Sequence, residues 1–196
     1  AGRGAAARRA VIEIASGQTL EAFMVENIFR PLGLDDTYFY IPPDKTARRP
    51  AIYRVVDGAL RIHRVYGEPD ERSRYFYGGG GVQSAPRDVL KFARLFLHEG
   101  KVDGVRILKP ESVRQMMSDQ LGDKAPARFT WGFGGAIQPL PSGGTVYGWT
   151  GGGFSVLWVD PALDLVAYFT MPLSPPGDNE LLADFRRLVY QARVAP

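Results

Sequence analysis

The strongest constraint on the fold is a change of hydrophobic period at Trp131. Before this residue apolar side chains recur mostly at helical spacing, and after it they follow short strand-like runs. The order of helices, then strands, then one last helix predicts an α+β fold: an antiparallel sheet covered by a C-terminal helix, after an N-terminal helical and irregular region. The expected strands are Gly132–Ile137, Thr145–Trp149, Phe154–Asp160 and Leu165–Met171, and Asp178 is expected to cap the last helix.

Caps and turns divide the region before Trp131. A Thr side chain can accept the first N–H groups of a helix, and glycine suits the left-handed residue that ends one. Asp-Gly between two strand-like runs is a strong hairpin signal. We expect a helix over about 5–16 that stops at Gly17, and a second helix from Thr19 that Pro31 and Gly33 end. The strands Ile52–Val56 and Leu60–Val65 are expected to form a hairpin joined at Asp57-Gly58. Two further helices are expected, one capped by Ser84 and closed by Gly100, and one from Pro110 to about Ser118.

The first ten residues, AGRGAAARRA, have a biased composition without apolar periodicity. Although the helical pattern reaches back to about residue 5, this bias is typical of a basic arm or of an altered or truncated start. We therefore expect residues 1–10 to be an unstructured start, and the folded domain to cover residues 11–196.

Composition excludes several classes of protein. Cysteine is absent, which removes disulfides, Cys-based zinc sites and cysteine nucleophiles. After the first ten residues the chain carries 21 basic and 21 acidic residues, so no basic stripe marks a nucleic-acid partner. The longest clean apolar run, Leu165–Phe169, is far shorter than the roughly 18 residues of a membrane span. Neither His63 nor His98 has a second histidine at metal spacing, so no metal or other cofactor is expected.

Most catalytic motifs fail on their spacing. No serine has the Gly-x-Ser-x-Gly pattern, and Ser155 lacks the second glycine. The quartet Gly78–Gly81 lacks the residues that complete a phosphate loop, so it predicts a tight turn before a helix. Asp36 fits a turn or cap better than a catalytic carboxylate. Tyr75–Tyr77 fits either a pocket wall or a buried aromatic run.

One glycine-rich segment, Tyr147–Gly153, is suggestive. It ends one predicted strand and leads into the next. Two interpretations stay open for it: an ordinary hairpin turn, or a strand end whose backbone N–H groups donate to the oxyanion of a reacting carbonyl.

Three segments, in this order, resemble the C-terminal half of serine β-lactamase-like hydrolases. They are VIEIASGQTLEAFMVENIFRPLGL at Val11–Leu34, GGGGVQSAPRDVLKF at Gly78–Phe92 and GWTGGGFSVLWVDP at Gly148–Pro161. The superfamily includes class C β-lactamases, penicillin-binding carboxypeptidases and family VIII esterases. The resemblance implies a partial β-lactamase/transpeptidase-like fold and catalysis through an acyl-enzyme on serine.

The resemblance also implies roles for four residues. Trp149-Thr150-Gly151 falls where the family has Lys-Thr-Gly, and a Trp-x-Gly version is similar to that of family VIII esterases. By this resemblance Thr150 borders the acyl group and the backbone N–H of Gly152 is one oxyanion donor. Trp149 replaces the basic residue, and because the Trp-x-Gly version is similar to that of family VIII esterases, the resemblance favours an esterase over a β-lactamase.

The family's Ser-x-x-Lys and Tyr-x-Asn motifs are absent from this sequence. No catalytic nucleophile or general base is therefore identified, and we expect a fragment of an ester or amide hydrolase that is inactive alone. The alternative is a non-catalytic module that keeps a ligand or partner site. The expected partner is a small ester or amide, and an exposed sheet edge is expected to favour self-association. The compartment stays open between cytoplasmic and periplasmic or secreted.

Overall fold

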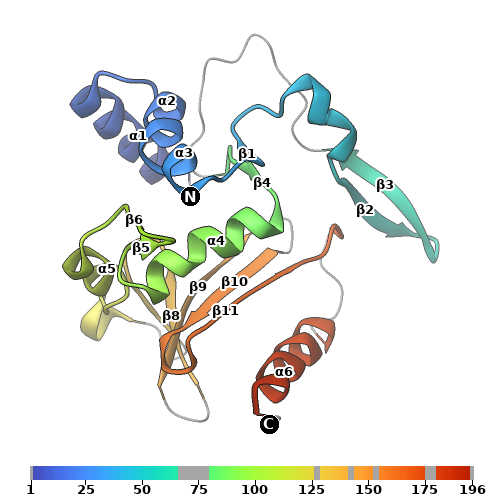
Figure 1. Ribbon diagram of the computed structural model, residues 1–196. Helices are drawn as coiled ribbons and strands as arrows, with labels where there is room; N and C mark the ends of the chain where they lie inside the picture. Colours follow the sequence, from blue (N-terminus) through green and yellow to red (C-terminus); the bar gives the residue numbers. More distant parts are fainter. Residues whose placement is uncertain are drawn as a thin grey trace.

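A five-stranded antiparallel sheet occupies the centre of the computed structural model, which describes residues 2–65, 80–125, 129–140, 144–151, 155–174 and 180–194 (Figure 1). The strand order is β11-β10-β9-β8-β7, so each strand pairs with its neighbour in the sequence. The α+β class and the antiparallel sheet predicted above are confirmed. The strands are β7 (Thr130–Trp131), β8 (Ala136–Pro139), β9 (Thr145–Gly151), β10 (Ser155–Asp160) and β11 (Leu165–Thr170).

The first predicted strand is divided in two. The sequence predicts one strand over Gly132–Ile137, whereas β7 ends before Gly132 and β8 begins at Ala136. Gly134 has a φ of +89°, and a Cβ at Gly132 would lie 1.9 Å from the Met116 carbonyl oxygen. The glycines therefore form a tight loop against another element instead of extending a strand.

Two helices cover the two faces of this sheet. The helix α4 (Pro86–Leu97) packs Phe96 against Tyr147 of β9. The helix α6 (Glu180–Val194) packs Phe185 against Trp158, in a hydrophobic cluster that also contains Val146. Because Val146 and Tyr147 are adjacent in one strand, their side chains point to opposite faces. The predicted C-terminal covering helix is confirmed, while its expected cap, Asp178, lies outside the described residues.

The turn between β10 and β11 rests on a buried carboxylate. Asp160 is fully buried and accepts hydrogen bonds from the Leu163 N–H at 3.2 Å and the Tyr190 hydroxyl at 3.0 Å. A short 3-10 helix (Pro161–Leu163) and left-handed Asp164, with φ +50°, complete the turn. Asp160 therefore joins the end of the sheet to α6.

The N-terminal helices begin earlier than the sequence predicts. The helix α1 spans Gly2–Ser16, so residues 2–10 are helical and not the unstructured start expected for 1–10. Alanine and arginine are strong helix formers, and Arg9 pairs with Glu13 across one turn at 2.8 Å. As predicted, the helix stops at left-handed Gly17, with φ +69°.

The second helical segment contains an irregular turn. Thr19 caps α2 (Leu20–Met24) by accepting from the Ala22 N–H, as predicted. A π-helical turn (Val25–Phe29) then joins α2 to α3 (Arg30–Leu32), which ends at left-handed Gly33. Pro31 therefore lies inside the helical segment instead of ending it. The π turn stands directly before this proline, whose missing N–H interrupts the hydrogen-bond ladder.

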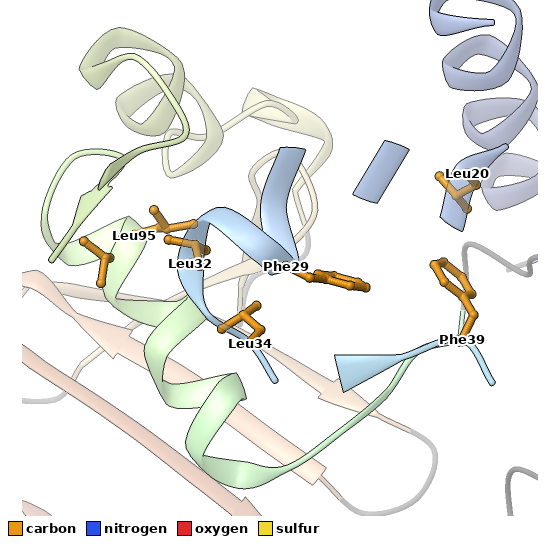
Figure 2. Packing of buried hydrophobic residues seen from close by; sticks show 7 residues of the cluster. Leu20, Phe29, Leu32, Leu34, Phe39 and Leu95 are labelled. Atoms are coloured by element: carbon orange, nitrogen blue, oxygen red, sulfur yellow. The ribbon is translucent and has the colours of Figure 1, made fainter. Parts of the chain in front are cut away.

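A third hydrophobic cluster joins these helices to α4. Figure 2 shows Leu32 beside Leu95 of α4, with Leu34 next to them. Each of these side chains is at most 5% exposed. The cluster also holds Leu20, Phe29, Phe39 and Val102.

A buried polar network fixes the start of α4. The short strands β1 (Thr37–Tyr38) and β4 (Gln83–Ser84) pair with each other. Ser84 was expected to cap the helix, but Ala85 is the N-cap, and the Ser84 hydroxyl contacts the Thr37 hydroxyl at 2.8 Å. Asp88 of α4, 6% exposed, accepts from the Asp36 N–H and the Thr37 hydroxyl at 2.8 Å each. The carboxylate thus holds the start of β1 on the helix, and the Thr37 hydroxyl links β4 to the same network.

The remaining elements lie outside the main sheet. The predicted hairpin is confirmed as β2 (Ala51–Val56) and β3 (Ala59–Val65), whose turn residues Asp57 and Gly58 both have positive φ. Asp36 lies in a turn, where it pairs with Lys45 at 2.8 Å and Arg48 at 2.7 Å. These hydrogen bonds, from Arg48 first, hold the pKa of the carboxyl well below its usual range. The other elements are 3-10 helices Pro43–Arg48 and Gly122–Lys124, strands β5 (Lys101–Val102) and β6 (Val105–Arg106), and helix α5 (Pro110–Met116).

Replacing Asp88 with alanine is expected to lower the free energy of unfolding by about 2–4 kcal/mol. The substitution leaves the Asp36 N–H and the Thr37 hydroxyl without this acceptor, and each buried unsatisfied group costs about 1–3 kcal/mol. Urea denaturation measures the change. Asp184→Ala is the control, because its exposed ion pair with Arg187 contributes about 0.5 kcal/mol or less. Equal losses in the two variants would contradict this role for Asp88.

The strand β11 has a sheet neighbour on one side only among the described residues. Such an edge recruits other chains, so we predict that the chain self-associates through β11 in sedimentation velocity. Thr170→Lys places a charge at the exposed end of this strand and is expected to shift the distribution towards monomer without lowering the unfolding midpoint. A monomeric parent chain, or an oligomer that Thr170→Lys leaves unchanged, would contradict the prediction.

Candidate active site

The Trp149–Gly151 segment forms the end of β9, beside an open edge of the sheet. On one side it pairs with β10, in the register Trp149 with Leu157 and Gly151 with Ser155. On the other side the pairing with β8 stops one residue earlier, at Gly148. Trp149 is 51% exposed and Thr150 is exposed. Within the described residues, a ligand can therefore approach the backbone of this segment from the β8 side.

Two glycines permit the close pairing of β9 with β10. A Cβ at Gly148 would lie 2.1 Å from the Leu157 carbonyl oxygen, and one at Gly151 would lie 2.6 Å from the Ser155 hydroxyl oxygen. Real Cβ atoms do not approach other atoms this closely. At Gly148 the Cβ would clash with fixed backbone, whereas at Gly151 it would clash with a side chain that can rotate. The pairing of β9 with β10 therefore requires glycine more strictly at position 148 than at position 151.

Tyr147 connects this strand end to the core. Its ring lies 5.0 Å from that of Phe96, and its hydroxyl donates to the Phe133 carbonyl at 2.8 Å. Gly135 leaves room for the ring, because a Cβ there would lie 2.6 Å from a ring carbon. Burial raises the pKa of the Tyr147 phenol to about 12. The hydroxyl therefore stays protonated near neutral pH and positions the loop before β8.

An aromatic surface continues from Trp149 onto β7. The Trp149 ring lies 5.2 Å from that of Trp131, inclined by 59°. The Trp131 ring in turn lies 5.8 Å from Phe129 in an edge-to-face contact. We call these three residues the aromatic shelf. Sequence reasoning did not identify Phe129 or Trp131 as site residues, because their only relation to Trp149 is the strand pairing that brings them together.

A hollow beside the shelf receives Thr150. Its polar lining comes from Thr150, Gln138 of β8 and Arg186 of α6. The Arg186 guanidinium carbon lies 5.1 Å from the centroid of the Trp158 ring. Thr150 thus lines a small hollow, and the expectation that it borders an acyl group stays a prediction. Helical periodicity could not reveal that Arg186 lies in the same lining.

Several other candidates lie elsewhere or outside the described residues. Gly152, Gly78, Gly79 and Tyr75–Tyr77 fall outside them. His63 lies on β3 near Arg54, and His98 follows the last residue of α4. The described part of the chain contains no group of three or more His, Cys, Asp or Glu residues placed for a metal. No helix in that part is long and apolar enough to cross a membrane.

The hydroxyl groups of three described serines make hydrogen bonds to nearby groups. Ser84 contacts Thr37, Ser16 donates to the Ile12 carbonyl, and Ser118 donates to the Gln115 carbonyl. None of these three serines is followed three residues later by a lysine, so none has the Ser-x-x-Lys pattern of an activated nucleophile.

Comparison with known families shows which protein family this chain belongs to. The family model described as Beta-lactamase matches residues 8–191. The chain belongs to the beta-lactamase family. The resemblance read from the three sequence segments is confirmed, and with it the partial β-lactamase/transpeptidase-like fold.

The relatives of this beta-lactamase-family chain are longer. Protein Rv1367c of Mycobacterium tuberculosis is 34% identical over 171 residues, which cover 76% of this chain and 42% of the relative. Lovastatin esterase of Penicillium rubens is 29% identical over 219 residues, which cover 92% and 53%. The unliganded structure of simvastatin synthase (LovD) from Aspergillus terreus superposes with a TM-score of 0.75 at 26% identity, over 95% and 53%. The chain thus spans about half the length of these relatives.

Gly148→Ala and Gly151→Ala are expected to differ in stability. The new methyl group at Gly148 meets the Leu157 backbone, which cannot move without breaking strand pairs, so we expect a loss of about 3 kcal/mol or more. At Gly151 the Ser155 side chain can rotate away, and the expected loss is below about 1 kcal/mol. Thermal unfolding of the two variants provides the measurement, and equal midpoints would show that the close approach at Gly148 is unimportant.

Proposed function

We propose that this chain is the C-terminal part of a serine hydrolase that cleaves esters or amides through an acyl-enzyme, with esters favoured. The observation that carries the proposal is the position of Trp149–Gly151 at an open edge of β9, with Trp149 half exposed. The names of two relatives, lovastatin esterase and a putative D-alanyl-D-alanine carboxypeptidase, agree with cleavage of an ester or an amide.

Esters are favoured because of the charge at this site. Where the family has a lysine that can pair with a carboxylate, this chain has the neutral ring of Trp149. An ion pair with a substrate carboxylate is therefore lost at this position, whereas the ring can contact an uncharged group. An uncharged ester suits such a wall better than an anionic β-lactam.

In the proposed reaction this chain contributes binding and oxyanion stabilisation. A serine outside this chain attacks the acyl carbon, and the carbonyl oxygen takes up the negative charge. The Gly152 N–H donates to that oxygen, while Trp149 and Thr150 border the acyl site. The bond from the acyl carbon to the leaving oxygen then breaks, and the alcohol leaves with a proton. Water finally hydrolyses the acyl-serine bond and releases the acid.

The chain on its own is proposed to be inactive, since Ser-x-x-Lys and Tyr-x-Asn are absent from its sequence. The second candidate function is a ligand-binding or interaction remnant of the same fold. The aromatic shelf, with Trp149 exposed and its other two rings partly buried, favours this candidate, because such a surface can bind a ligand without any nucleophile.

Incubation with a fluorophosphonate probe tests the proposed inactivity. Intact-mass spectrometry is expected to show no stoichiometric adduct, because no serine of this chain follows the Ser-x-x-Lys pattern. A protein extended by its upstream coding sequence serves as the comparison. If that sequence carries Ser-x-x-Lys and a tyrosine motif, one adduct and hydrolysis of phenyl butyrate are expected. An adduct on any serine of the short chain would overturn the inactivity. An extended protein with both motifs but no hydrolysis would overturn the proposed enzyme.

A further inference from the structure

The aromatic shelf is held from behind by backbone contacts. The Trp131 carbonyl accepts from the Gln120 N–H at 2.8 Å, and the Phe133 N–H donates to the Met116 carbonyl at 2.9 Å. Gly132 lies so close to the end of α5 that any side chain there would collide with it. Trp131 is therefore fixed against α5 and the segment that follows it, and half-exposed Trp149 packs on this fixed ring. A preorganised aromatic surface binds a flat apolar group at a small cost in entropy.

A carboxylate lies near the β7 end of the shelf. Asp119 accepts hydrogen bonds from the hydroxyl of Thr130, the residue before Trp131, and from the Leu121 and Gly122 N–H groups. These contacts, the Thr130 hydroxyl first, lower the pKa of the Asp119 carboxyl, so it is ionised at neutral pH. Arg186 lies in the hollow, which Trp149 and Thr150 also line, so this cation is at the β9 end of the shelf and Asp119 is at the β7 end. A group on the β7 side of the site therefore meets aromatic rings and a carboxylate.

We propose that Phe129, Trp131 and Trp149 form the subsite for an uncharged aryl group of the ester, and that Phe129 and Trp131 determine specificity. This inference rests on the proposed function and extends it from esters in general to neutral aryl esters. Aromatic rings pair with an aryl group in offset or edge-to-face contacts. A negative charge on the same aryl group would lose hydration and be repelled by Asp119. The shelf therefore discriminates on the charge of the bound ring as well as on its shape.

Fluorine NMR of the chain labelled with 5-fluorotryptophan tests the subsite without any need for turnover. The chain has three tryptophans, and Trp131→Phe and Trp149→Phe assign two signals directly and the third by elimination. Methyl 4-methylbenzoate is the neutral probe, and monomethyl terephthalate carries a carboxylate at the same ring position. We expect the neutral ester to shift the Trp131 and Trp149 signals and leave that of Trp158, which is 1% exposed, unchanged. We expect the anion to bind at least about tenfold more weakly.

Substitutions on and beside the shelf test where methyl 4-methylbenzoate binds. Phe129→Leu and Trp131→Leu each remove one ring of the shelf and are expected to weaken binding of methyl 4-methylbenzoate about threefold to tenfold. Phe133→Leu is the control, because Phe133 is 49% exposed on the neighbouring loop and does not belong to the shelf. Its affinity is expected to equal that of the parent chain. Thermal unfolding of each variant confirms that the fold is retained.

The outcomes separate this inference from the proposed function. A shift of the Trp158 signal without a shift of the Trp131 signal would place the ester in the hollow, which Trp149 and Trp158 line. Equal affinities for the neutral and anionic probes would remove the charge discrimination. Either result overturns the inference. An equal loss in Phe133→Leu and Trp131→Leu would also overturn it, because the contact would not be specific to the shelf. Binding at the shelf by a chain whose extended form hydrolyses no ester would uphold the subsite and reject the enzyme.

Discussion

The close pairing of β9 with β10 is the contact on which the rest of the structure depends. It exists because Gly148 has no Cβ, which would otherwise meet the Leu157 carbonyl oxygen. The paired strand then supplies Val146 to the core under α6 and Tyr147 to the core under α4. The same strand ends in Trp149–Gly151, so the candidate site extends from a strand whose residues belong to two hydrophobic clusters. A site on such a strand keeps its geometry better than one on a loop.

Much of this architecture could be predicted from local patterns in the sequence. The alternation after Trp131 predicts the sheet, Asp57-Gly58 predicts a hairpin, and Thr19 predicts a helix start; all three are confirmed. Each of these signals acts over a few residues, where side-chain period and backbone preference decide the conformation. The Trp149–Gly151 segment could be singled out for a similar reason, because its glycines and its tryptophan follow one another in the chain.

The predictions that failed depend on contacts between distant residues. Ser84 has the chemistry of a helix cap, yet its hydroxyl contacts Thr37, which lies 47 positions earlier in the chain. The glycines after Trp131 resemble a continuing strand until the Met116 carbonyl is placed against Gly132. Trp131 enters the site for the same kind of reason, since only the folding of β7 and β8 onto β9 brings its ring to Trp149. Local patterns carry no information about such pairs.

The sheet has two exposed parts, the edge strand β11 and the open end of β9, and the strand order places β10 between them. A strand that pairs with β11 therefore need not touch the aromatic shelf. The shelf rests on α5, β7 and β9, which all lie on this chain. In the proposed enzyme, substrate binding and bond cleavage therefore depend on different parts of the family's fold: this chain supplies the wall for the ester, and the nucleophile comes from a Ser-x-x-Lys motif that its sequence does not contain. A surface of this kind can keep its affinity for a ligand whether or not chemistry follows.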